Sequence, residues 1–183
     1  MPSSDPSSRS PAPQRADDSW LGVDVVFEDD DWPDPDQITD LIAEASAALA
    51  AHGQMQGLGA SEACVALSSD AEVRKLNADY RGLDKATNVL SFPAPVAPVP
   101  QPVRFLGDVV LARETVEREA TERGIPFADH LRHLTVHGLL HLLGYDHETD
   151  AQAAEMEGIE TQILARLGIA DPYGDRDEWL LRP

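Results

Sequence analysis

The chain has 183 residues and one cysteine, Cys64, which excludes an intramolecular disulfide and a cysteine-rich metal site. The formal net charge of −19 disfavours nonspecific binding to nucleic acid, because affinity for phosphate comes from lysine and arginine. No apolar run reaches the length of about 18 residues that a membrane span needs, so we expect no membrane partner. A single free thiol fits a reducing compartment, and we expect a cytoplasmic location.

The first segment, residues 1–19, is rich in proline and serine and lacks the apolar stretch of a secretory signal. We predict a disordered tail there. The β-branched segment 21–28 then predicts a strand, and the alanine-rich segment 36–52, with apolar residues on one stripe, predicts a helix. A second strand is predicted at 62–68, followed by a short helix at 70–79.

The next segments predict a strand pair. Strands are expected at 87–92 and 104–112, and the connection 93–102 between them contains five prolines, which exclude an internal strand or helix. Three helices are then predicted, at 113–123, 126–143 and 150–167. Interleaved strands and helices followed by helices alone indicate an α+β fold: one domain with a mixed sheet of about four strands, packed with about five helices.

The few basic residues are unevenly distributed along this acidic chain. Both lysines and two arginines fall within twelve residues of each other: Arg74, Lys75, Arg81 and Lys85. If the protein binds RNA, this segment is the predicted contact surface, because phosphate recognition needs positive charge. The alternative for Arg81 is a solvated loop arginine, or an ion pair with Asp79 or Asp84.

Three histidines carry the strongest chemical signal. His137 and His141 are four residues apart in the most apolar predicted helix, so they share one face. Gly144 can end the helix and turn the chain back, so that His147 supplies a third nitrogen. Three imidazoles with one open position are typical of catalytic zinc. We therefore predict a metal site on the C-terminal part of this helix and its following turn.

The same pattern, HxxxHxxGxxH, has the spacing of the metzincin peptidases. Those enzymes carry a glutamate directly after the first histidine, and it serves as the general base. Here that position is Gly138, which argues against a peptidase.

Other polar residues around the triad leave alternatives open. His133 lies one turn before His137 and could orient a ligand, contact substrate or pack in the core, whereas His130 is expected to be solvated. Asp146 could accept an imidazole N–H or cap the turn. A closed, purely structural metal site would need a fourth ligand, for which Asp146 and His133 are the candidates.

Two further stretches complete a resemblance. The sequence HGLLHLLGYDH at 137–147, the block from Leu76 to Pro93 (LNADYRGLDKATNVLSFP) and the strand Leu106-Gly107-Asp108 resemble the YbeY family of metal-dependent single-strand endoribonucleases. That family is linked to maturation of the 3′ end of small-subunit ribosomal RNA and to ribosome quality control. Leu83, Ala86 and Asn88 depart from the common pattern of the block.

The resemblance implies a YbeY-like metallohydrolase domain over residues 20–170, followed by a C-terminal extension at 171–183. It implies that His137, His141 and His147 are metal ligands and catalytic residues, and that Arg81 is catalytic. One Zn²⁺ is the expected cofactor, with other divalent metals as alternatives. The expected partners are single-stranded RNA and ribosomal RNA, with ribosomal proteins as further candidates. The rival readings are a ribosome-associated binding factor with a structural metal, and another zinc hydrolase such as a peptidase.

Overall fold

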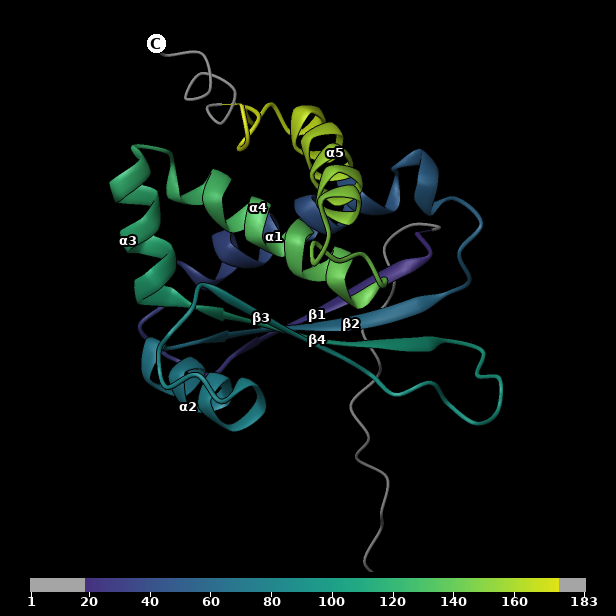
Figure 1. Cartoon of the computed structure of the whole chain (residues 1–183), viewed down its shortest axis with the longest axis horizontal. Helices are drawn as coiled ribbons and strands as arrows, with labels where there is room; N and C mark the ends of the chain where they lie inside the picture. Colours follow the sequence, from purple (N-terminus) through teal and green to yellow (C-terminus); the bar gives the residue numbers. More distant parts are fainter. Residues whose placement is uncertain (1–18, 175–183) are drawn as a thin grey trace, which may run out of the picture.

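The computed structural model describes residues 19–174, so the predicted tail lies outside the described residues except for Ser19. Within this range the chain forms a four-stranded sheet and five α-helices (Figure 1). The strands are β1 (Leu21–Phe27), β2 (Ser61–Ser68), β3 (Val89–Pro93) and β4 (Arg104–Ala112). The helices are α1 (Pro35–Ala50), α2 (Asp70–Arg81), α3 (Arg113–Arg123), α4 (Phe127–Leu142) and α5 (Asp150–Arg166). The predicted α+β fold is confirmed.

The sheet has the strand order β1-β2-β4-β3. Strands β1, β2 and β4 are parallel. Strand β3 pairs with β4, as the sequence predicted, and the pairing is antiparallel. Strand β3 therefore forms one edge of a mixed sheet. Successive side chains of a strand face opposite sides, so Leu90 and Phe92 point to one face and Ser91 to the other.

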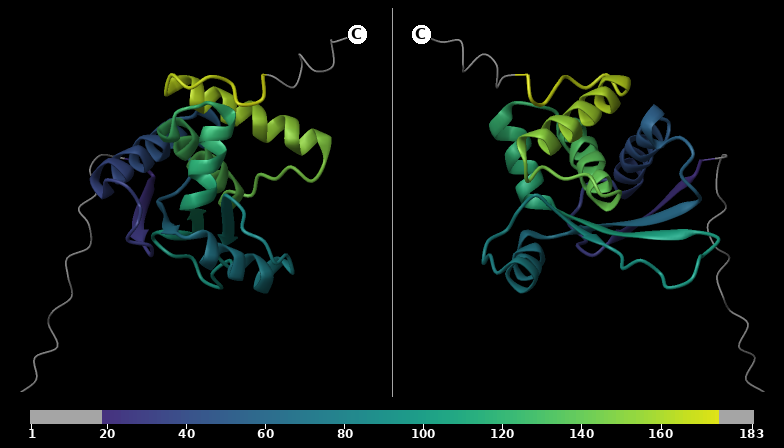
Figure 2. Two further views of the ribbon diagram at one scale, coloured as in Figure 1. Left: turned by 90° about the vertical axis from the view of Figure 1, so that its left-hand side faces the viewer. Right: turned by 45° about the vertical axis from the view of Figure 1, so that its right-hand side comes forward.

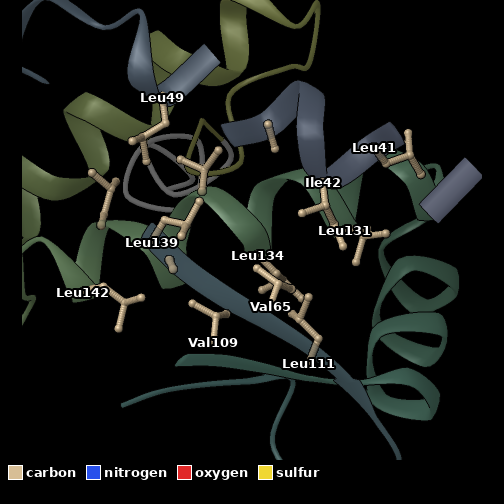
Figure 3. Close-up of a cluster of buried hydrophobic side chains, with 14 of the residues drawn as sticks. Leu41, Ile42, Leu49, Val65, Val109, Leu111, Leu131, Leu134, Leu139 and Leu142 are labelled. Atoms are coloured by element: carbon tan, nitrogen blue, oxygen red, sulfur yellow. The ribbon is translucent and has the colours of Figure 1, made fainter. Parts of the chain in front are cut away.

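Helices cover the two faces of the sheet unequally. Helices α1 and α4 pack on one face and α5 lies over them, whereas α2 covers the other face (Figures 1 and 2). The main core lies between the sheet and the first group of helices. Leucines of α4 meet Leu41, Ile42 and Leu49 of α1 and the valines of β2 and β4 there (Figure 3). Burial of these side chains fixes α4 at the centre of the fold.

Element boundaries follow local capping. Helix α1 begins at Pro35, because the side chain of Asp34 accepts a hydrogen bond from the N–H of Gln37. Helix α2 runs on to Arg81, two residues beyond its predicted end. Strand β3 begins at Val89 rather than at residue 87, since the Asn88 side chain bonds the N–H of Val89. The loop predicted at 53–59 contains one short 3₁₀ turn.

Among the described residues, no helix is both long enough and apolar enough to cross a membrane.

Candidate metal centre

Helix α4 places two of the three predicted ligands. Its leucines face the core. His137 and His141, which are one turn apart, lie against Glu160 of α5 and the turn at Tyr145, respectively. The helix ends at Leu142, and Gly144 takes a left-handed conformation with φ 95°. A residue with a side chain would be strained in this conformation. The turn brings the exposed His147 back against the other two rings.

Gly138 allows this helix to lie close to the sheet. A Cβ atom at this position would lie 2.5 Å from Cγ1 of Val109 and 3.3 Å from Oγ of Ser91. The Ser91 hydroxyl also donates a hydrogen bond of 3.1 Å to the carbonyl of Gly138. Any larger side chain would therefore push α4 away from β3 and β4. The position that carries the general base in metzincins has no room for a glutamate here.

The structure brings the three predicted histidines together. One ring nitrogen from each of His137, His141 and His147 lies within 4.8 Å of the others. The Nε2 atoms of His137 and His141 are 3.1 Å apart. Tetrahedral zinc with bonds of about 2.0–2.1 Å would place its nitrogens about 3.3 Å apart, so this spacing is close to that of a bound pair.

The partners of the other ring nitrogens assign the protons. Nδ1 of His141 lies 3.0 Å from the carbonyl oxygen of Tyr145, which can only accept, so this nitrogen carries the hydrogen. Nδ1 of His137 lies 2.6 Å from Oε1 of Glu160 and likewise donates. With hydrogens on both Nδ1 atoms, a lone pair on each Nε2 atom would face the other. Such an arrangement is repulsive unless a cation lies between the nitrogens.

A metal ion suits this arrangement better than a shared proton. Burial, together with the neighbouring imidazoles of His137 and His147, lowers the pKa of His141 and so favours its neutral form. A proton also bridges only two nitrogens, whereas three converge here. Neutral imidazoles with the second nitrogen hydrogen-bonded are the form in which histidine binds metals. The residues present therefore fit a divalent ion.

Glu160 of α5 belongs to the candidate site, although the motif analysis did not identify it. Its side chain is fully buried. Burial alone would raise the pKa of its carboxyl, but close contacts with the imidazoles of His133 and His137 lower that pKa to about 2. The carboxylate is thus ionised and can orient His137, as carboxylates commonly do for metal-bound histidines. The signal in the sequence was a charged residue inside the apolar stripe of α5, which also contains Met156, Ile159 and Ile163.

The two candidates for a fourth ligand lie elsewhere. Oδ1 of Asp146 accepts the backbone N–H of His147 at 2.8 Å, so this side chain caps the turn. Nε2 of His133 lies 3.4 Å from the hydroxyl of Tyr173 and 3.6 Å from Oε2 of Glu160. Within residues 19–174, no fourth histidine, cysteine, aspartate or glutamate joins the three-histidine group.

A second group, formed by His133, His137 and Glu160, also has closely spaced ligand atoms. Hydrogen bonding accounts for it, because Nδ1 of His137 already donates to Glu160 and the second carboxylate oxygen accepts from Tyr173. His133 and Glu160 therefore surround His137 of the candidate metal centre and need no second ion.

The expectation that His130 is solvated was wrong. Its side chain is buried at 1% exposure, because α3 packs against this part of α4. Nε2 of His130 lies 2.8 Å from Oε2 of Glu119 in α3. Burial lowers the pKa of His130, which keeps the ring neutral at neutral pH.

Arg81, the remaining predicted site residue, does not contact the histidines. It is the exposed last residue of α2, on the face of the sheet opposite α4. Asp84 pairs with Arg74 instead, at 2.7 Å, and Arg81 has no ion pair within the described part of the chain. Only the edge strand β3 separates the end of α2, where Tyr80 packs on Phe92, from α4, where Ser91 bonds Gly138.

A pocket of about 770 Å³ opens beside the metal centre. Its walls include His133 and His137 of α4, Asn88 at the start of β3, and Tyr173 after α5. Of the three histidines, His137 alone lines the pocket, so the pocket adjoins the centre from the N-terminal half of α4. His137 itself is partly accessible, with 21% of its side chain exposed.

Comparisons with known proteins identify the family of this chain. The family described as "Endoribonuclease YbeY" matches residues 27–168. A protein of this name from Rhizobium meliloti is 50% identical over 162 residues, which cover 85% of this chain and 96% of that protein. One from Bradyrhizobium is 50% identical over 159 residues, covering 85% and 94%.

A solved structure has the same fold. The solution structure of a Thermotoga maritima protein aligns with a TM-score of 0.51 and 23% identity, covering 82% of this chain and 98% of that chain. At this identity the likeness concerns the fold alone. The family match and the two relatives establish more: this chain belongs to the endoribonuclease YbeY family.

Proposed function

We propose that this chain is a metal-dependent, single-strand-specific endoribonuclease that acts in maturation of the 3′ end of small-subunit ribosomal RNA and in ribosome quality control. Relatives that are half identical to it carry the name endoribonuclease. The observation that carries the metal dependence is the pair of Nε2 atoms in His137 and His141, which face each other at 3.1 Å with both Nδ1 atoms engaged.

The proposed cofactor is one Zn²⁺ ion held by His137, His141 and His147. Three imidazole ligands suit zinc, and also nickel, better than magnesium, which prefers oxygen. When bound, such an ion supplies a Lewis acid for phosphoryl oxygens and a water molecule whose pKa is lowered toward about 7.

The protein's own residues prepare this centre. Glu160 and the carbonyl of Tyr145 hold the protons on Nδ1 of His137 and His141, which keeps both Nε2 lone pairs directed at one point. The pocket beside His137 would bring a phosphodiester next to this ligand. With three protein ligands, one position stays open for a reactant, as in catalytic zinc sites.

Arg81 is the proposed phosphate-binding residue. Its guanidinium is exposed and has no ion-pair partner among residues 19–174, so its donors are available to a phosphate. An RNA strand that crosses the edge strand β3 would meet Arg81 on one side and the histidines on the other. A single strand can bend around such an edge, whereas a stiff duplex cannot, which supports the single-strand preference.

The neighbourhood of Arg81 is the part of this acidic protein most suited to RNA. Lys75 and Lys85 lie in the same segment, although Lys75 pairs with Glu72 at 2.6 Å. Because the whole chain carries a net charge of −19, basic ribosomal proteins are proposed as further partners that would bring it to RNA. A ribosomal substrate would place the protein in the cytoplasm.

Two other functions have less support. A peptidase would need a general base, and Gly138 has no space for one. A binding factor with a purely structural metal would need a closed site, but Asp146 and His133 are engaged elsewhere. Zinc-dependent digestion of casein would revive the first alternative.

Cleavage of single-stranded ribosomal RNA fragments tests the proposal. The wild type and a His141→Ala variant, purified identically, are incubated with the fragment alone and with the fragment annealed to its complement. We expect the wild type to cut the single strand only and the variant to cut neither. Equal cleavage by both proteins would reveal a contaminating nuclease or a different site.

A further inference from the structure

The carboxylate of Glu160 is fully buried, and both of its oxygens are engaged. Oε1 lies 2.6 Å from Nδ1 of His137. Oε2 accepts a hydrogen bond from the hydroxyl of Tyr173 and lies 3.6 Å from Nε2 of His133. Since a buried carboxylate without donors is costly, the partners of one oxygen also fix the direction of the other.

Tyr173 lies in a short turn after α5 that brings its ring back over α4. Its backbone N–H donates to Oδ1 of Asp171 at 2.9 Å, and the same oxygen accepts from the Thr161 hydroxyl at 3.1 Å. The ring meets His133 edge-on, with centroids 5.9 Å apart and an interplanar angle of 90°. Contacts to α4 and α5 therefore hold the ring, and its hydroxyl points at a buried carboxylate.

We propose that Tyr173 is a positioning residue of the metal centre that acts through Glu160. Its hydroxyl holds Oε2, so that Oε1 stays aligned with the Nδ1–H of His137 and the Nε2 lone pair of His137 points at the ion. The inference rests on the proposed metal site and is independent of the RNA substrate. Tyr173 lies beyond the segment 27–168 that the family match covers, so no motif pointed to it.

The same structure would result if the Tyr173 ring only packed over the pocket and its hydroxyl had no role. The two roles differ in the hydroxyl: packing needs the ring alone, whereas positioning needs the hydrogen bond to Glu160. The variant Tyr173→Phe removes this hydrogen bond and keeps the ring. Tyr80→Phe is the matched control, because the Tyr80 side chain lies on α2 across the sheet and is 71% exposed.

The test measures the zinc dissociation constant of the full chain by competition with a chromophoric chelator. Glu160→Gln is expected to weaken zinc binding by about 10- to 100-fold, as loss of an outer partner of a metal-bound histidine commonly does. Tyr173 is one hydrogen bond further from the ion than Glu160, so Tyr173→Phe is expected to weaken zinc binding by about three- to tenfold. Tyr80→Phe should bind zinc like the wild type. The visible absorption of the cobalt-loaded protein should change in the first two variants only.

A double variant shows whether Tyr173 acts through Glu160. In a Glu160→Leu background, which lacks both oxygens, Tyr173→Phe should have no further effect on zinc affinity. Wild-type affinity and an unchanged cobalt spectrum in Tyr173→Phe would refute the inference, and so would equal losses in both backgrounds. Thermal unfolding of the metal-free variants verifies that each is folded. These readouts need no RNA, so the endoribonuclease proposal can fail while this inference stands.

Discussion

Helix α4 carries two histidines that are similar in surroundings and different in proposed role. His130 and His141 both have a pKa lowered by burial, and each has one ring nitrogen near an acceptor oxygen. The difference lies in the second nitrogen. In His130, Nδ1 is enclosed with no hydrogen-bond partner among the described residues, whereas Nε2 of His141 faces another imidazole nitrogen at 3.1 Å. We therefore expect a buried, neutral histidine to bind a metal only where its free lone pair converges with others.

The largest effect should separate these two residues. His141→Ala is expected to abolish zinc binding at micromolar metal and RNA cleavage above background, because two remaining imidazoles hold zinc poorly. His130→Gln should retain one zinc ion per chain, since the side chain of His130 bonds Glu119 and not the metal. Metal content after dialysis, measured by mass spectrometry, tests zinc binding in both variants. Zinc loss in His130→Gln would show that the comparison is wrong.

The second prediction distinguishes metal binding from catalysis. Arg81→Ala should lower RNA cleavage by roughly 10²–10³-fold, if its guanidinium stabilises charge on the phosphate, and should leave zinc affinity unchanged. Arg81→Lys keeps the charge but loses the planar fork, so only partial activity is expected. Initial rates on a labelled single-stranded RNA give the result. Full activity in Arg81→Ala would remove this residue from the mechanism.

The comparison also depends on how closely α4 packs against the sheet. Gly138→Ala would place a methyl group 2.5 Å from a Val109 methyl, so we expect it to destabilise the fold by about 1–3 kcal/mol. Gly158→Ala, in α5, is the control, because no described atom other than its chain neighbours and the nearby backbone of its own helix lies within 4 Å of the added Cβ. Urea unfolding of the metal-free proteins measures the difference. Equal stability of both variants would mean that α4 shifts without cost.

The smallest predicted effect concerns pH. In the unfolded chain His130 takes up a proton near its ordinary pKa of about 6.5, whereas in the folded chain burial lowers that pKa. The unfolded state therefore binds more protons below about pH 6.5, and folding stability should fall as the pH drops. His130→Gln should flatten this dependence between pH 7 and 5. Unfolding curves that keep the same slope in the variant would assign the effect to other groups.

The sequence predicted what is local. The four-residue spacing of His137 and His141 and the glycine that turns the chain toward His147 lie within one helix and its end, so their geometry follows from helix periodicity. The order of strands and helices was predicted for the same reason, with ends displaced by a few residues where caps such as Asp34 decide.

What the sequence did not predict depends on packing between distant segments. Glu160 reaches His137 from another helix, 23 residues later, and only its place in an apolar stripe hinted at burial. His130 was expected in solvent because it lies near the start of its helix, but α3 covers it and Glu119 bonds it. The place of Arg81, across the edge strand from the histidines, follows from the sheet topology and not from any motif.

X-ray absorption at the zinc edge of the zinc-loaded protein tests the central claim most directly. We predict three imidazole nitrogens at about 2.0–2.1 Å and one oxygen that does not come from the protein. In the His147→Ala variant, the same measurement should show one imidazole nitrogen fewer. A shell of four protein ligands would contradict an open catalytic site, and a protein that binds no zinc at all would contradict the metal centre itself.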